Sequence, residues 1–400
     1  MVAEKTNGPL AGVTVLDLTR VLSGPYCTML LADMGARVIK VEQPARGDDT
    51  RAWGPPFLGG ESSYFLSINR NKESLTLDFK APAGRAVLDT LIGRADVLVE
   101  NFRPEALARQ GLDYPTLAQA QPRLVYASLS GYGHTGPRRA EPGYDAVLQG
   151  EGGLMSITGP ADGPAYRLGV AVADIVTGMF AAQGVLLALL ARHQTGLGQH
   201  VDVAMLDSVA ALLTYQAGIV FADGTSPGRM GNRHPSIAPY DTFESADGPL
   251  VLAVGNDDQW GRFCRVAGLE ALEADERFAT NPARVRHYDA LAPSIRQALA
   301  TDTRAGWTAR LVAAGVPCGP VRTVDEALDD VQLAARGMIE RLAHPTAGEI
   351  AVLGVPIKLS ATPGGVREPP PTLGEHTDTV LREIGLTGEE IASLRQSGVV

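Results

Sequence analysis

The order of short apolar segments in the first 130 residues constrains the fold more than any other feature of this sequence. β-Branched and leucine-rich runs at 13–18 and 37–41 flank a helix-like segment at 25–34. Strands that alternate with helices are typical of βαβ units, in which a mostly parallel sheet is covered by helices. The pattern continues, and its later members are strand-like runs at 74–78, 96–99 and 124–128 and a helix-like run at 104–110. The sequence therefore predicts an α/β fold with a parallel sheet.

The pattern becomes helical from about residue 174. The segment 179–193 is almost wholly apolar, which predicts a helix buried on most of its sides. Segment 223–233 is rich in Gly, Pro, Ser and Arg and predicts a linker or a mobile loop. A second unit is expected beyond it, with a strand pair within 240–254 and helices to about residue 314. After the turn-rich segment 316–320 the chain is expected to cross back.

Composition excludes some classes of protein. The 400 residues include 45 Asp and Glu against 35 Lys and Arg, for a net charge of −10, and they contain no basic run. Nucleic-acid binding depends on neutralising phosphates, so it is not expected. A small anionic ligand needs only a local cluster of cations and stays possible.

Cysteine and histidine usage points to an intracellular protein without a metal. The three cysteines, Cys27, Cys264 and Cys318, are far apart, which fits neither a disulfide framework nor a thiolate zinc site. The seven histidines show no metal-ligand spacing. The first ten residues lack the pattern of a signal peptide, and apolar stretches such as 185–191 are too short to span a bilayer. We therefore expect a cytoplasmic protein with no metal and no membrane or nucleic-acid partner.

Asp174 is the candidate for acid chemistry. It follows a run of small apolar residues and opens the apolar helix. An aspartate in this position commonly caps a helix. Alternatively, it is a carboxylate that neighbouring apolar groups partly desolvate and that the helix N-terminus keeps anionic.

The turn at Ser23-Gly24-Pro25 is a weaker signal. It is a plain strand-to-helix connection or, alternatively, a place where backbone N–H groups and a helix N-terminus lie near an anion.

Cations are frequent in the first third of the chain. Each one alone is typical of a solvated surface, but as a set they are compatible with the phosphates of a nucleotide-like ligand. These residues are Arg20, Arg70, Lys72, Lys80, Arg103, Arg109, Arg138 and Arg139.

Several motifs, in this order and spacing, resemble one family nearly from end to end. They include Asp17 to Pro25, Gly35 to Glu42, Asn69 to Lys72, Val99 to Pro104, Gly131 to Gly133, Ala173 to Ile175, Gly198 to Asp202, Pro317 to Pro320 and Leu373 to Thr377. With them the chain resembles the class III CoA-transferases, the CaiB/BaiF group, and its motifs are most similar to those of the succinyl-CoA–dicarboxylate (glutarate-type) members.

The resemblance implies a fold and a mechanism. The fold would have a large Rossmann-like domain made of residues 1–222 and 330–400, and a small α+β domain with linkers at 223–329. Two chains would form an interlocked homodimer. Asp174 would be the nucleophile, forming first an anhydride and then a thioester with CoA. The partners would be acyl-CoA thioesters, as substrates, and free carboxylic acids. No cofactor would be permanently bound.

The resemblance also implies roles for individual residues. Tyr144 and Asp145 would lie near the thioester. Gly228 and Gly231 would belong to a flexible flap over the site, and Arg229, Arg233 or His234 would pair with the remote carboxylate of a dicarboxylic acid. The residues assigned to CoA contact are Val21, Gln43, Arg70, Lys72, Leu77, Lys80, Asn101, Phe102 and Arg109. Gln43 stands where some relatives have an arginine near the adenine.

Two alternatives use the same resemblance. The α-methylacyl-CoA racemases share the fold, but they carry a His after the Gly of a Gly-His-Asp motif as a second acid/base group. This chain has Gly143-Tyr144-Asp145 there, and the ordinary pKa of a tyrosine is about 10. A non-catalytic acyl-CoA-binding protein is the other alternative. It would be expected to lose Asp174 or the glycine-rich loop, both of which are present.

Overall fold

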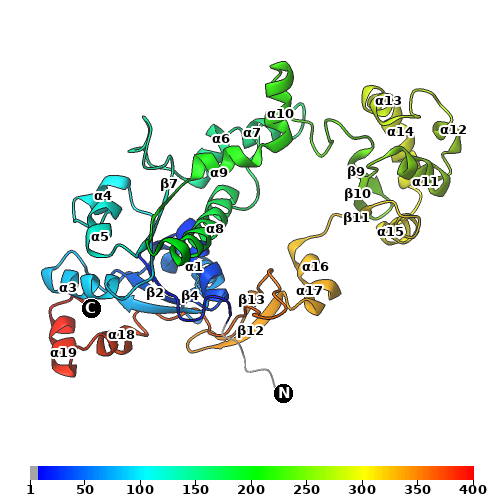
Figure 1. Ribbon diagram of the computed structural model, residues 1–400. Coiled ribbons are helices and arrows are strands. Elements are labelled where there is room, and N and C mark those ends of the chain that lie inside the picture. Colours follow the sequence, from blue (N-terminus) through cyan, green and yellow to red (C-terminus); the bar gives the residue numbers. More distant parts are fainter. Residues whose placement is uncertain (1–7) are drawn as a thin grey trace. The chain divides into compact units, whose positions relative to one another are not determined.

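A six-stranded parallel sheet organises the larger part of the molecule in the computed structural model, which describes residues 8–400 (Figure 1). Every neighbouring pair in this sheet is parallel. The order is β5-β2-β1-β6-β7-β8, so β1 has neighbours that come from both directions along the chain. The strands are β1 (Thr14–Asp17), β2 (Arg37–Glu42), β5 (Lys72–Thr76), β6 (Val97–Glu100), β7 (Val125–Ser130) and β8 (His200–Ala204). The α/β fold with a parallel sheet is thus confirmed.

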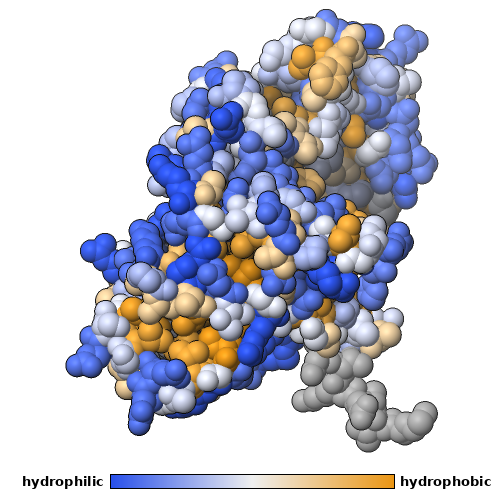
Figure 2. Space-filling model, turned by 60° about the vertical axis from the view of Figure 1, so that its left-hand side comes forward, coloured by the Kyte–Doolittle hydropathy of each residue, from blue (hydrophilic) through white to orange (hydrophobic). Residues whose placement is uncertain are grey.

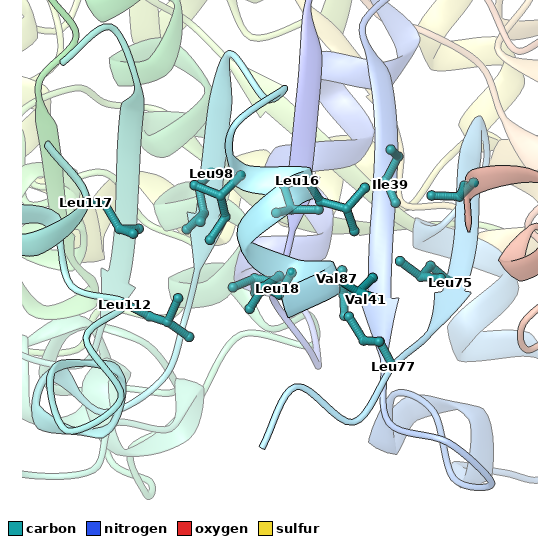
Figure 3. Packing of buried hydrophobic residues seen from close by; sticks show 14 of the residues in the cluster. Leu16, Leu18, Ile39, Val41, Leu75, Leu77, Val87, Leu98, Leu112 and Leu117 are labelled. Carbon is teal, nitrogen blue, oxygen red and sulfur yellow. The ribbon is translucent and has the colours of Figure 1, made fainter. Parts of the chain in front are cut away.

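Helices cover both faces of this sheet. One face packs on α3 (Pro82–Ile92), α4 (Pro104–Ala108), α5 (Tyr114–Ala120), α18 (Thr377–Glu383) and α19 (Gly388–Gln396). The side chains of this core include Leu16, Ile39 and Leu98, which Figure 3 shows along neighbouring strands. The opposite face, with Val15 and Val97, packs on α1 (Ser23–Asp33) and α8 (Val172–Thr195). Successive side chains of a strand point to opposite faces, so two apolar faces require the continuous apolar runs that the sequence has.

The described chain divides into two compact units. Unit 1 comprises Met1–Leu154, Leu168–Tyr215 and Val331–Val400, and unit 2 comprises Met155–Arg167 and Gln216–Asp330. The sequence-based boundaries lay at 222/223 and 329/330, and the segment Met155–Arg167 was not foreseen in the smaller unit. The first seven residues of the expected large domain lie outside the described residues.

Unit 2 is built on a three-stranded antiparallel sheet, ordered β11-β10-β9. Its core holds large apolar residues, among them Trp260, Phe263 and Trp307. Its elements are β9 (Tyr240–Ser245), β10 (Gly248–Ala253), α11 (Asp257–Ala267), α12 (Glu270–Glu273), α13 (Asn281–Arg286), α14 (Tyr288–Leu299), α15 (Arg304–Ala313), β11 (Cys318–Pro320) and α16 (Val324–Leu328).

Shorter elements complete the described chain. Two β-hairpins, β3–β4 and β12–β13, stand apart from the main sheet. The remaining elements are η1 (Asp49–Ala52), β3 (Phe57–Leu58), β4 (Glu61–Ser62), α2 (Ser63–Ile68), α6 (Asp145–Glu151), α7 (Leu154–Ile157), α9 (Met205–Leu212), α10 (Thr214–Asp223), α17 (Val331–Ala335), β12 (Ile339–His344) and β13 (Gly348–Leu353).

Helix α8 differs from its expectation in two respects. Its 24 residues make it longer than the apolar stretch suggested, and it is the one helix among residues 8–400 long and apolar enough to cross a membrane. A core helix meets the same criterion, and α8 packs on α1 and on the sheet. It was also expected to be buried on most sides, yet Met179, Leu187 and Leu190 are more than half exposed.

The contact between α8 and α1 depends on a glycine. A β-carbon added at Gly178 would lie 2.6 Å from the carbonyl oxygen of Ser23 and 3.2 Å from the ring of Tyr26. A side chain at position 178 would therefore require the backbone to move. The absence of a side chain at Gly178 therefore allows the first turns of the two helices to meet.

We predict that Gly178→Ala lowers the free energy of unfolding by about 1–3 kcal/mol, because overpacking at this contact must displace α1. Gly388→Ala is the matched control. Gly388 is also helical, is exposed, and would have nothing within 4 Å of an added β-carbon. Urea denaturation of both variants tests this: equal stabilities for the two would contradict it.

Candidate functional site

A cavity lies where the carboxyl ends of β1 and β6 meet. Parallel sheets with this strand order, 3-2-1-4-5-6 when the six strands are counted along the chain, bind ligands where the order reverses, beside the first strand. The cavity measures about 320 Å³, and residues after both strands line it, including Val21, Ser23, Asn101 and Phe102. Asp174 of α8 lies on its wall. The topology therefore places the candidate carboxylate at the expected binding edge.

Asp174 does not cap its helix. The N-cap of α8 is Ala171, which has no side-chain capping bond, and Asp174 lies within the first turn. The backbone N–H of Ala173 donates instead to Asp145 Oδ1 at 2.9 Å. The capping interpretation of Asp174 is therefore wrong, because Asp145 accepts the bond that a cap would accept.

The environment of Asp174 makes its charged form costly. Burial and the nearby carboxylate of Asp145 raise the pKa of Asp174 to about 7. Hydrogen bonding from the side chain and the backbone of Ser23 lowers the pKa of Asp174 and opposes this rise. A helix N-terminus also favours an anion. Near neutral pH, Asp174 is thus present in both its protonated and its ionised form.

The predicted neighbours of the thioester occupy the start of α6. Tyr144 is its N-cap, lines the cavity and is 71% exposed. Asp145 holds α8 as described and also accepts a hydrogen bond from Gln149 Nε2 at 2.8 Å. The structure brings both residues to the side of Asp174 that faces α6, and gives Asp145 a structural role that the sequence did not reveal.

A second cavity of about 520 Å³ shares Arg20, Asp49 and Phe102 with the first. Besides Phe102, three residues predicted to contact CoA line it, namely Gln43, Leu77 and Lys80. Leu77 is buried in the sheet core, so it presents little surface. Together the two cavities give an elongated ligand a continuous set of lining residues.

Two residues predicted to contact CoA, Arg70 and Lys72, are buried in ion pairs. The guanidinium of Arg70 forms an ion pair with Asp33 at 2.6 Å, and its side chain is 3% exposed. The ammonium of Lys72 is wholly buried and contacts Asp17 at 3.2 Å, and Asn69 and the carbonyl of Pro25 at 2.9 Å. Neither residue lines the two cavities. Both cations neutralise acids inside the fold, and sequence alone does not separate such cations from surface ones.

Arg109 and Asn101 are also predicted to contact CoA, and the structure gives each of them different surroundings. Arg109 is exposed at the end of α4 and lines neither cavity. Asn101 lines the first cavity, but its amide donates to the carbonyl of Arg20 at 2.7 Å and accepts from the N–H of Arg20 at 3.0 Å. The side chain of Asn101 therefore holds the turn after β1.

The loop with the remaining predicted residues belongs to unit 2. Gly231 has a left-handed backbone (φ 63°) and its N–H donates to the carbonyl of Gly159. No atom lies within 4 Å of a β-carbon built at Gly228. Arg233 contacts the carbonyl of Val285 at 3.2 Å and stacks on Tyr288. These contacts lie within unit 2.

The other two candidate residues of this loop also bond inside unit 2. Arg229 donates to the carbonyl of Gly163 at 2.7 Å, and the Nδ1 of His234 accepts from the N–H of Ser236 at 3.0 Å. Roles toward a substrate stay predictions for both residues, and for Arg233.

Glu100 ends β6 immediately before the cavity segment. Its carboxylate accepts the N–H of Phe102 at 2.8 Å and lies 3.8 Å from His134 Nε2. Burial raises the pKa of Glu100 to about 7, against a hydrogen bond from Ser128 that lowers it. An ionisable group thus stands directly behind the lining residues.

Comparison with known proteins decides the family. The model of CoA-transferase family III matches residues 10–377. The chain belongs to CoA-transferase family III. It is 44% identical over 387 residues to the succinate–glutarate CoA-transferase of Agrobacterium fabrum, covering 94% of this chain and 96% of that protein.

Two further comparisons agree. The succinyl-CoA:glutarate CoA-transferase of Mus musculus is 41% identical over 393 residues, which cover 98% of this chain and 90% of that one. The crystal structure of a CaiB/BaiF family protein from Brucella suis aligns with a TM-score of 0.84 at 42% identity, covering 94% of this chain and all of that one. The resemblance inferred from the motifs is confirmed, and the protein is a class III CoA-transferase.

Sequence reasoning missed several residues of this CoA-transferase site. Ser23 was noted only as part of a turn, although the idea that the turn offers N–H groups to an anion agrees with its bond to Asp174. Lys40 and Asp48 lie under that turn as a wholly buried ion pair at 2.8 Å. A lysine in the middle of an otherwise apolar strand was the signal, because a buried ammonium needs a partner.

We predict that Glu100→Gln stabilises the protein increasingly as pH rises. Glu100 has a raised pKa in the folded state, so its contribution to stability is full below about pH 4.5 and is lost as pH rises through about 7. A glutamine does not titrate. The difference in unfolding free energy should therefore grow by up to about 3 kcal/mol between pH 5 and pH 8.

Urea denaturation at both pH values measures this difference. Glu105→Gln on α4 is the control, since Glu105 is exposed. A pH-independent difference between Glu100→Gln and the wild type would contradict the assignment.

Proposed function

We propose that this CoA-transferase moves CoA from succinyl-CoA to a free dicarboxylic acid through covalent intermediates on Asp174. The observation that carries the proposal is the setting of Asp174. It lies on the wall of a cavity at the binding edge of the sheet and has a pKa of about 7. Ser23 lines the same cavity and favours the anionic form of Asp174 by hydrogen bonding. A partly desolvated carboxylate is a better nucleophile than a fully hydrated one.

The proposed sequence begins with attack of the Asp174 carboxylate on the thioester carbonyl. CoA leaves as a thiolate, and a mixed anhydride with succinate forms. The thiolate then attacks the aspartyl carbonyl, succinate departs, and CoA is held as a thioester of Asp174. The acceptor carboxylate attacks this thioester to give a second anhydride and thiolate. The thiolate attacks the acceptor's acyl carbonyl, which frees Asp174 and releases the new acyl-CoA.

Ser23 supports this chemistry by its position. Each attack on the aspartyl or acyl carbonyl develops negative charge on an oxygen, and donors that are already oriented stabilise such charge without reorganising. Ser23 lines the same cavity, and hydrogen bonding from its side chain and backbone lowers the pKa of the carboxylate that becomes the acyl group. Both intermediates hydrolyse readily, so exclusion of water is needed. We assign that role to the loop with Gly228 and Gly231, by its resemblance to the family's flap.

The names of the relatives support the substrate class. Two proteins at 44% and 41% identity are named for succinate or succinyl-CoA and glutarate. We therefore propose succinyl-CoA as donor and a short dicarboxylic acid such as glutarate as acceptor. Arg229, Arg233 and His234 are the candidates for the remote carboxylate. The cytoplasmic location stays a prediction, consistent with three free cysteines.

A homodimer is the proposed assembly. Exposed apolar side chains form a stripe on α8, with Met179, Leu187 and Leu190 each more than half exposed. Phe221 of α10 is 86% exposed. Figure 2 shows that apolar residues gather in patches among hydrophilic ones on the face drawn. Such patches mark contact surfaces, and the family resemblance identifies a second copy of the chain as the occupant.

We predict that purified wild-type protein with succinyl-CoA and glutarate forms glutaryl-CoA, and that Asp174→Ala loses at least about 10³-fold in kcat because it has no nucleophile. Mass spectrometry of the acyl-CoA species is the measurement, with a panel of mono- and dicarboxylic acids as acceptors. Asp162→Ala, an exposed acid of the same kind, is the control.

Undiminished transfer by Asp174→Ala would overturn the mechanism. Deuterium uptake at the α-carbon of a 2-methylacyl-CoA, with no transfer, would support the isomerase alternative instead.

We predict that the protein is a dimer by size-exclusion chromatography with light scattering, and that Leu187→Glu combined with Leu190→Glu makes it a monomer. Two charges on the apolar stripe cannot be desolvated in an interface at low cost. Val312→Glu, on an exposed apolar residue of α15, should leave the dimer intact. A monomeric wild type would remove the proposed assembly.

A further inference from the structure

The turn between β1 and α1 has an unusual backbone. Val21 adopts a left-handed conformation (φ 71°), which is unfavourable for a β-branched residue. Two residues later, Ser23 lines the same cavity as Asp174 and, by hydrogen bonding, lowers the pKa of that carboxylate. The direction of the Ser23 donors therefore depends on a turn that the local sequence does not favour, and contacts from elsewhere must hold it.

Asp48 makes that contact at the strained residue. Its Oδ1 accepts the N–H of Val21 at 3.2 Å and also the N–H and hydroxyl of Thr50 at 2.9 and 2.8 Å. Its Oδ2 lies 2.8 Å from Lys40 Nζ, and both side chains are wholly buried. Lys40 Nζ in turn donates to the carbonyl of Thr19 at 2.8 Å. The two members of this ion pair thus hydrogen-bond the backbone of Thr19 and of Val21, the residues on either side of Arg20.

Other contacts also restrict the backbone of the turn between β1 and α1. Asn101 bonds both the N–H and the carbonyl of Arg20. A β-carbon at Gly24 would lie 2.3 Å from that of Thr19, so the turn closes tightly on itself. Asp48 does not line the first cavity, whereas Val21 and Ser23 do. Asp48 and Lys40 line the second cavity, but their side chains are wholly buried, so Asp48 acts on Asp174 through the backbone of the turn.

We propose that Asp48, held by Lys40, is a positioning residue of the transfer reaction, because it fixes the left-handed turn at Val21 that aims the donors of Ser23 at Asp174. The proposal rests on the proposed role of Asp174 as nucleophile. It adds a requirement outside the reacting groups: catalysis depends on a buried ion pair that lies beside the second cavity and does not contact Asp174.

The sign of a pH effect separates positioning from direct electrostatics. Asp174 faces Asp145 and Ser23, and Tyr64 senses the charges of Asp174, Asp145 and Asp48. Removing the negative charge of Asp48 would by itself ease ionisation of Asp174 and lower its pKa. Losing the Ser23 hydrogen bonds would raise its pKa. The two causes therefore move the acid limb of kcat/KM in opposite directions.

The first experiment compares the pH profile of succinyl-CoA–glutarate exchange in wild type and Asp48→Ala. We expect Asp48→Ala to lower kcat about 10²-fold, as for a misplaced catalytic group, and to shift the acid limb to higher pH. Val21→Gly added to Asp48→Ala should recover much of the loss, because glycine adopts a positive φ freely. A limb that moves to lower pH or stays in place would overturn the proposal, as would absence of rescue.

Asp33→Ala is the matched control for general damage. Asp33 also forms a buried ion pair, with Arg70 at 2.6 Å, but its carboxylate bonds to Arg70 and Asn71 and not to the turn at residues 19–23. It should lower the melting temperature without shifting the acid limb. If Asp48→Ala does not fold, Asp48→Asn replaces it: the amide keeps an oxygen for Val21 but loses the attraction of Lys40, so the same upward shift is expected in smaller measure.

A crystal structure of the Asp48 variant gives a readout that needs no substrate. We expect Val21 to leave the left-handed region and Ser23 to lose its bonds to Asp174. An unchanged turn would overturn the positioning role even if the wild type transferred CoA normally. A moved turn in a protein that transfers no CoA would instead refute the proposed function while leaving the role of Asp48 in the turn intact.

Discussion

The close approach of α1 and α8 is the constraint on which the site depends. Both helices pack on the same face of the sheet, and Gly178 lets the first turn of α1 come within contact of α8. Ser23 at the start of one helix therefore meets Asp174 at the start of the other. Two positive helix ends and two hydrogen-bond donors converge on one carboxylate, which offsets part of the cost of burying its charge.

Buried charges support this arrangement from below. Asp17 and Asp48 lie under the turn that joins β1 to α1, and each pairs with a buried lysine, Lys72 and Lys40 respectively. Burial by itself would raise the pKa of Asp17, but the two ammonium groups hold it at about 2. Such pairs contribute little net stability, yet removal of one partner is costly. Their value here is geometric, because they bond the backbone of the turn.

Sequence reasoning predicted the fold class and the family with few errors. The strands near 13–18, 37–41 and 124–128 and the helix that contains Asp174 all exist, because apolar runs of strand length and a long apolar run leave few alternatives. The prediction that α8 is buried on most sides failed since hydropathy does not say which faces a single chain covers. The CoA assignments to Arg70 and Lys72 stay predictions, and the structure places both cations in internal ion pairs, which motif similarity does not distinguish from ligand contacts.

The sequence by itself determined the parallel α/β architecture, the membership of CoA-transferase family III and Asp174 as the candidate nucleophile, since these follow from local periodicity and from motifs in order. Only the tertiary structure decided what surrounds that carboxylate. Residues 23, 48, 145 and 174 are far apart along the chain and are brought together by strand order and helix packing. Electrostatic interactions weaken with distance in space, not in sequence. The raised pKa of Asp174 and the hydrogen bond between Val21 and Asp48 therefore arise only in the folded chain.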